Sequence, residues 1–199
     1  MNQGIKAQWS ENVIVVDAEY IDRVAFNLIV NFERMLGRKI QQADMARWID
    51  CVALDGGMKP ENDAITSVVL IHEKSSEGFE NFMPDSFQEL DGKAFSDNLG
   101  EFVFSAVSVE ELTTKDDLLV DIVQAVMEAK EVRRMMVIPN SEDGDCYGRL
   151  RQLLHRADDD KRITLFAMQP MPGGNFRQEI LGYSLMQALG ISASELDSN

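Results

Sequence analysis

The sequence contains few cysteines and no long apolar run. Only Cys51 and Cys146 occur in 199 residues, so a disulfide framework is not expected. No stretch approaches the roughly 20 apolar residues that cross a bilayer as a helix, and residues 1–11 contain no apolar signal core. These absences predict a soluble, cytoplasmic protein with two reduced thiols.

Basic residues are also scarce. The chain has 19 Lys and Arg against 34 Asp and Glu, a net charge of −15. This charge argues against a broad surface for duplex DNA and against docking on anionic membranes, because both need many cations. The excess is uneven, since residues 41–129 carry 19 acids and five bases whereas residues 130–162 carry seven acids and eight bases. The second segment is therefore compatible with a local groove for single-stranded RNA.

Several familiar motifs are absent. The chain has neither the Gly-x-Gly-x-x-Gly fingerprint nor the Walker motif, which disfavours the usual modes of dinucleotide and nucleotide binding. It also lacks the Gly-x-Ser-x-Gly elbow of serine hydrolases. His72 and His155 are the only histidines and have no partner at ligand spacing, so zinc is not expected.

The pattern that is present alternates between strands and helices. Apolar runs such as residues 13–16 show no polar alternation, which is typical of strands buried on both faces of a parallel sheet. Five such strands are expected, at residues 12–17, 65–72, 102–107, 134–138 and 163–168. Helical spacing predicts helices at residues 21–36, 43–54, 115–130, 146–156 and 176–189. The order indicates a three-layer α/β sandwich of Rossmannoid type, with a mainly parallel five-stranded sheet.

We expect a single domain over residues 1–191. The segment around residues 73–99 is acidic and contains four phenylalanines interrupted by Pro84 and Gly92, and we predict an insertion made of loops and short helices. Residues 192–199 are rich in Ser and Asp, and we predict a flexible tail there.

Acidic residues follow the expected strands. Asp17 closes the first strand, and Asp143 and Asp145 follow the fourth. Asp117 and Asp121 lie four residues apart, on one face of the preceding helix. If the first and fourth strands are neighbours, these carboxylates would converge without a dedicated cationic partner. A hard cation such as Mg²⁺ or Mn²⁺ would then neutralise them.

Each acid also has a simpler interpretation. Asp117 stands three residues after Thr114 and fits a capping box, and Asp145 fits a helix N-cap. Asp143 precedes Gly144 and fits a turn, while Asp17 can simply end a strand. Taken singly, each acid is more often a cap or a turn than a ligand.

Together these residues resemble the NYN branch of PIN-like nucleases. The resemblance covers about residues 12–22 and 113–168, and its motifs are Asp17 after a strand, Lys115-x-Asp117-x-x-x-Asp121 on a helix, and Ser141-x-Asp143-Gly144-Asp145 after another strand. It implies a five-stranded sheet and metal-dependent RNA cleavage, with these acids holding the metal. The chain departs from that family at Tyr20, where Asn is usual, and at Asp116 and Glu142, where Gly is usual. The whole chain also resembles an uncharacterised bacterial family.

Three hypotheses follow. The first is a ribonuclease with Mg²⁺ or Mn²⁺, in which Arg149 or Arg151 holds single-stranded RNA. Its catalytic acids would be Asp17, Asp117, Asp121, Asp143 and Asp145, and all except Asp117 would hold the metal. The second is a non-catalytic module that binds a protein partner or another copy of itself through the acidic middle or the last helix. The third is a binder of a small molecule or anion at the edge of the sheet.

Overall fold

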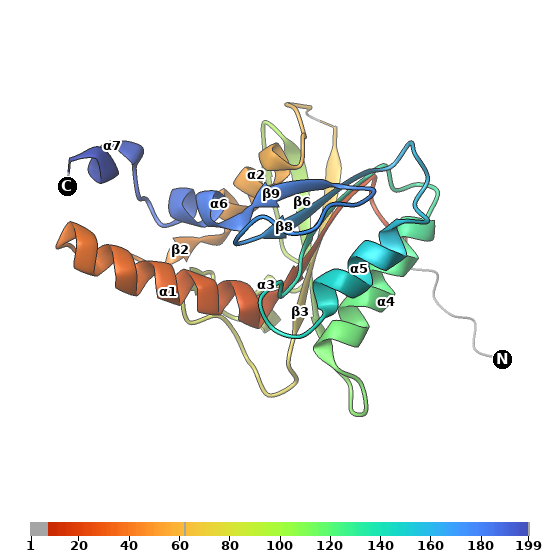
Figure 1. Cartoon of the computed structure of the whole chain (residues 1–199), viewed down its shortest axis with the longest axis horizontal. Coiled ribbons are helices and arrows are strands. Elements are labelled where there is room, and N and C mark those ends of the chain that lie inside the picture. Colours follow the sequence, from red (N-terminus) through yellow and green to blue (C-terminus); the bar gives the residue numbers. More distant parts are fainter. Residues whose placement is uncertain (1–7, 62, 199) are drawn as a thin grey trace.

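A seven-stranded sheet forms the centre of the molecule in the computed structural model, which describes residues 8–61 and 63–198 (Figure 1). Its strands are β1 (Asn12–Asp17), β3 (Ile65–His72), β5 (Ala94–Asp97), β6 (Gly100–Ser108), β7 (Arg134–Ile138), β8 (Arg162–Ala167) and β9 (Arg177–Ile180). They lie in the order β5-β6-β3-β1-β7-β8-β9, and every pair is parallel except β5 with β6. Two further strands, β2 (Ala43–Asp44) and β4 (Phe82–Met83), form a separate parallel pair.

Helices cover both faces of the sheet. The helices are α1 (Ala18–Leu36), α2 (Met45–Asp55), α3 (Phe87–Leu90), α4 (Lys115–Glu128), α5 (Cys146–Leu154), α6 (Leu181–Ala188) and α7 (Ala193–Asp197). α1, α2 and α6 pack on one face, and α4 and α5 pack on the other (Figure 1). β1 contributes Ile14 and Val16 to the first core and Val13 and Val15 to the second, because successive strand residues point to opposite faces. The predicted three-layer α/β arrangement with a mainly parallel sheet is confirmed.

The sheet is larger than the five strands expected. The five predicted strands are all present, and β5 and β9 extend the two edges. β9 occupies the start of the helix predicted at residues 176–189, so that α6 begins only at Leu181. The sequence Arg177-Gln178-Glu179-Ile180 lacks the apolar run of a buried strand, and backbone pairing with β8 at an edge determines its conformation.

The order in which strands are added to the sheet switches sides at β1. From β1 the chain passes to β3 and β6 on one side, and α4 then returns it to β7 on the other side of β1. The carboxyl ends of β1 and β7 and the first turn of α4 therefore meet at one place. Ligand sites in parallel α/β sheets lie at such a switch in strand order.

Two elements extend away from this framework. Beyond Ala25, α1 has no fully buried residue and projects past the sheet (Figure 1). Residues 193–197, which we expected in a flexible tail, form α7 near the far end of α1. Glu195 of this helix accepts a hydrogen bond of 2.7 Å from Nε of Arg38.

Candidate functional site at the carboxyl edge of the sheet

Asp17 lies at the centre of the carboxyl edge, as its position at the end of β1 predicts. Its side chain is 1% exposed and caps α1, because Oδ1 accepts the backbone N–H of Tyr20 at 3.1 Å. The same oxygen lies 2.9 Å from Nζ of Lys115, whereas Oδ2 is buried without a hydrogen-bond partner among the described residues. Burial raises the pKa of Asp17, and the opposing effect of Lys115 does not cancel it.

Lys115, the first residue of α4, joins two carboxylates. Its Nζ donates to Asp17 and lies 3.4 Å from Oε1 of Glu19, which also accepts the backbone N–H of Glu73 just after β3. Oε2 of Glu19 is buried and has no partner among the described residues. Burial lowers the pKa of Lys115, but the charges and hydrogen bonds of Asp17 and Glu19 raise it above its usual value. Lys115 therefore stays protonated and is unsuited to act as a nucleophile.

The loop after β7 closes over this network. The hydroxyl of Tyr20 donates to Oε2 of Glu142 at 2.7 Å and lies 3.4 Å from Oγ of Ser141. One turn along α1, Nη2 of Arg23 lies 2.6 Å from Oδ2 of Asp143. The start of α1, directly after β1, is therefore adjacent to the loop after β7. This is expected if β1 and β7 are neighbours, and β1 does pair with β7.

The expectation that the acids lack cationic partners is wrong for three of the five. Asp17 pairs with Lys115, Asp143 with Arg23, and Asp117 with Arg149 at 2.9 Å. The pKa of Asp143 is lowered by hydrogen bonding from Asn140 and by Arg23. The pKa of Asp117 is lowered by hydrogen bonds to Thr114 and Arg149. Basic side chains, of which the motifs include only Lys115, therefore pair with three of the five predicted acids.

The remaining predicted site residues lie outside this network. Asp121 is exposed one turn further along α4, and Asp145 precedes α5 without a side-chain capping bond. Thr114 caps α4, because its hydroxyl oxygen accepts the backbone N–H of Asp117 at 3.1 Å, which is one of the two hydrogen bonds of the predicted capping box. Nε of Arg151 donates to the carbonyl of Gly173.

The donor set does not fit a metal in this arrangement. Within residues 8–61 and 63–198, no three His, Cys, Asp or Glu side chains come together in a group that could hold a metal ion. In this network, Asp17 and Glu19 share Lys115 between them. An ammonium group in this position repels a divalent cation.

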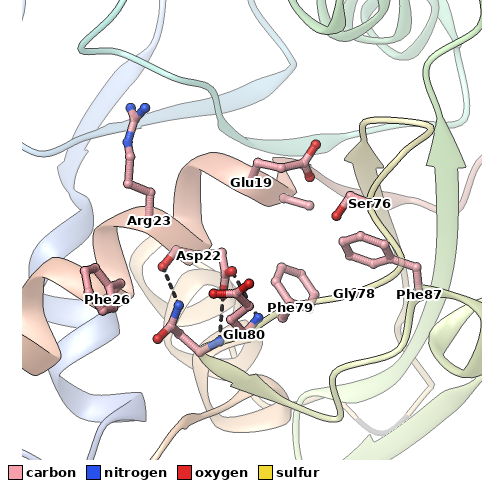
Figure 2. A pocket seen from close by; sticks show the side chains of 11 residues that line it. Glu19, Asp22, Arg23, Phe26, Ser76, Gly78, Phe79, Glu80 and Phe87 are labelled. Atoms are coloured by element: carbon pink, nitrogen blue, oxygen red, sulfur yellow. Dashed lines mark hydrogen bonds between the residues drawn. The ribbon is translucent and has the colours of Figure 1, made fainter.

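A cavity of about 370 Å³ lies beside this network (Figure 2). It is bounded by the first turns of α1 and by the loop at residues 76–81, and Glu19 lies at its rim. Asp22 holds the loop in place, because its carboxylate accepts the backbone N–H groups of Glu80 at 3.0 Å and Asn81 at 2.8 Å. The lining carries three carboxylates and one guanidinium, together with three aromatic rings; these residues are Glu19, Asp22, Glu80, Arg23, Phe26, Phe79 and Phe87.

Sequence reasoning missed the lining from residues 76–81, which the structure places in the insertion expected around residues 73–99. It also assigned no role to Lys115, Glu19 or Tyr20, although Lys115 was part of the quoted motif. An acid on the first helical turn, two residues after the strand-ending Asp17, was the available signal for Glu19. Nothing local connects Asp22 with a loop almost 60 residues away.

The thiol at the same edge is not a nucleophile. Cys146 is buried at the start of α5, and burial, with smaller contributions from Asp116 and Asp17, raises its pKa to about 12. Reactive cysteines need a lowered pKa and access to solvent. Cys146 therefore serves as a small core residue, and Cys51 is also a free thiol.

No helix in the described part of the chain is both long enough and apolar enough to span a bilayer. No curated protein and no solved structure matches the chain. One family model does, and it matches residues 6–196, nearly the whole chain. Its description names no activity, and it offers no link to PIN-like nucleases. The protein thus belongs to a family of unknown function, DUF6621.

Proposed function

We propose that this protein binds a small ligand bearing a protonated amine, in the cavity at the carboxyl edge of the sheet. One observation carries the proposal. Oδ2 of Asp17 and Oε2 of Glu19 are buried and lack hydrogen-bond partners among the described residues, although buried carboxylate oxygens are normally bonded. Two carboxylates around one ammonium group leave a net negative charge, which a second ammonium group would balance.

The cavity has the chemistry to recognise such a group. Glu19 belongs to both the buried network and the cavity lining, so its negative charge acts on a ligand in the cavity even though its unbonded Oε2 is buried. Glu80 adds a second carboxylate, and the half-exposed ring of Phe26 adds an aromatic face. Carboxylates together with aromatic faces favour organic ammonium ions, and about 370 Å³ is the size of a small-molecule site. The excess of acids also makes a cation a better ligand than an anion here.

Thermal shift and calorimetry with putrescine test this proposal. Putrescine should stabilise the protein saturably, because a ligand that binds the folded state raises its free energy of unfolding. Neither 1,4-butanediol, which has the same chain without charge, nor sodium chloride at equal ionic strength should reproduce the effect. Glu19→Gln and Glu80→Gln should each weaken binding by about tenfold, the size expected for one charge-assisted hydrogen bond.

Glu131→Gln is the matched control, because Glu131 is exposed beyond the end of α4 and its substitution removes the same charge. If this variant weakens putrescine binding as much as Glu19→Gln, the effect is general attraction to an acidic protein and the proposal is wrong. An unchanged melting temperature with putrescine would also contradict it.

The metal-dependent ribonuclease is the second candidate function. The observation in its favour is that β1 and β7 are neighbours, which brings Asp17 and the Asp143 loop to the same edge. The ion pairs with Lys115 and Arg23 count against it. Cleavage of a labelled single-stranded RNA with Mn²⁺, lost in Asp17→Asn, would favour the ribonuclease over the amine site. The absence of cleavage across several RNAs with either Mg²⁺ or Mn²⁺ would contradict the ribonuclease hypothesis.

A further inference from the structure

Three arginines gather at the opposite, amino edge of the sheet. Arg134, Arg162 and Arg177 lie on the three adjacent strands β7, β8 and β9. Arg134 is directly opposite Arg162 in the register, and Arg177 is opposite Thr164, two residues beyond Arg162. Because alternate residues of a strand share a face, all three side chains leave the same face of the sheet.

The guanidinium groups of Arg134 and Arg162 repel each other, because like charges directly opposite each other on neighbouring strands are unfavourable. Nη1 of Arg134 donates to the carbonyl of Gly56 at the end of α2, at 2.6 Å. A Cβ atom on Gly57 would lie 2.9 Å from Nη1 of Arg134 and 3.6 Å from Nη1 of Arg177, so these two guanidinium groups approach the same point. Burial lowers the pKa of Arg134, and the positive charges of Arg162 and Arg177 lower it further.

The first two arginines have no close ion pair, although the negative charge of Glu11 acts on Arg134. Within the described residues, neither Arg134 nor Arg162 has a carboxylate oxygen within ion-pair distance. Arg177 lies 3.6 Å from Glu179 on its own strand. In a chain with a net charge of −15, two unpaired guanidinium groups on adjacent strands require an explanation.

A cavity of about 300 Å³ opens onto Arg134 and Arg162. Four basic side chains line it, those of Lys59, Arg133, Arg134 and Arg162, together with three acidic ones, those of Glu11, Glu61 and Asp160. Glu11 lies 3.6 Å from Arg133, so this pair offsets its own charge. Apart from that pair, the lining has three basic side chains, Lys59, Arg134 and Arg162, and two acidic ones, Glu61 and Asp160.

We propose that this cavity binds one phosphate group, either as inorganic phosphate or as the monoester of a small molecule. A planar guanidinium group donates two parallel hydrogen bonds to two oxygens of the same phosphate. The ligand is compact, because an extended polyanion such as RNA would meet Glu61 and Asp160 in the same lining. This site is independent of the amine site, which lies at the other edge of the sheet.

Calorimetric titration with inorganic phosphate and with glycerol 3-phosphate tests the proposal. Sodium chloride keeps the ionic strength constant in both titrations. At least one of the two should bind saturably with a stoichiometry of one, and tighter binding of glycerol 3-phosphate identifies the monoester as the ligand. Arg162→Gln should weaken this binding by about tenfold or more. Arg162 is exposed, and within residues 8–61 and 63–198 its side chain makes no hydrogen bond or ion pair, so this variant should fold.

Arg34→Gln is the control, since Arg34 is exposed near the end of α1 and carries the same charge away from the cavity. Its phosphate binding should equal that of the unmodified protein. Equal weakening in both variants, or no saturable binding of either probe, overturns the proposal. Tighter binding of a single-stranded oligonucleotide than of either probe, also lost in Arg162→Gln, would overturn it in favour of an RNA surface.

Discussion

Lys115 supplies the positive charge in the network at the carboxyl edge. Its side chain is 16% exposed and bridges Asp17 and Glu19, which come from the junction of β1 and α1. Without this ammonium group, Asp17 would be a buried carboxylate with no cation. Removing one partner of a buried ion pair leaves a charge without compensation. The free-energy cost of that charge exceeds the stabilisation that the intact pair provides.

Lys115→Met should therefore lower the free energy of unfolding by about 3–5 kcal/mol, measured by urea denaturation. Adding Asp17→Asn to this variant should restore part of the loss, because the buried charge is then removed as well. Lys130→Met, an exposed position after α4, should change the stability by less than about 0.5 kcal/mol. If Lys115→Met is no more destabilising than Lys130→Met, the ion pair contributes nothing to the fold.

At the scale of elements, two carboxylates meet where α2 approaches β5. Burial raises the pKa of Asp50 on α2 to about 7, and a hydrogen bond with Asp97 and the charges of Asp97 and Asp44 add to this shift. The folded state therefore holds a proton that the unfolded chain releases near the ordinary Asp value of 3.8. Stability from this group is full below that value and is lost as the pH rises towards 7.

Asp50→Asn should accordingly stabilise the protein at pH 8 and leave it nearly unchanged at pH 4, because the amide mimics the protonated acid. Melting temperatures measured between pH 4 and pH 8 test this, and the variant should show a smaller decline with rising pH. Asp121→Asn removes a charge from an exposed site on α4 and should leave the shape of that curve unchanged. A parallel decline in Asp50→Asn and the unmodified protein would contradict the prediction.

At the scale of the whole molecule, the net charge of −15 acts on stability as well as on binding. Self-repulsion among surface carboxylates opposes the compact state, and salt screens it over about 10 Å at 0.1 M. The ion pairs described above leave this excess unchanged, because their Lys and Arg residues are already counted in the net charge.

Raising sodium chloride from 20 mM to 300 mM should therefore raise the melting temperature at pH 8 by several degrees. The rise should be smaller at pH 4.5, where many carboxylates bind protons and the repulsion is weaker. Differential scanning calorimetry at the two pH values measures both effects. A melting temperature that falls with salt at pH 8 would show that attractive ion pairs outweigh the repulsion.

Strands buried on both faces could be predicted from sequence, whereas edge strands could not. β1, β3 and β7 begin and end where their apolar runs predict, because burial on both faces demands an uninterrupted run. β9 has no such run, and the sequence pattern placed a helix there. Its conformation depends on the exposed backbone groups of β8, which are far away in the sequence.

The candidate site follows the same division. The sequence placed Asp17 at a strand end and correctly related it to the loop that contains Asp143, because parallel strands share one carboxyl edge. It did not identify the partners of these acids. Arg23 and Arg149 reach Asp143 and Asp117 only once α1, α4 and α5 have packed, so no local spacing reveals these pairs.

The sequence by itself determined the layered α/β architecture, the two thiols and the uneven charge, because these depend on apolar periodicity and composition. Only the tertiary structure decided how the charges are used. It placed Lys115 between two carboxylates at one edge of the sheet, and Arg134 opposite Arg162 at the other. Electrostatic energy depends on distance and burial in three dimensions, so the sequence shows the acids of the motif but not which of them have cationic partners.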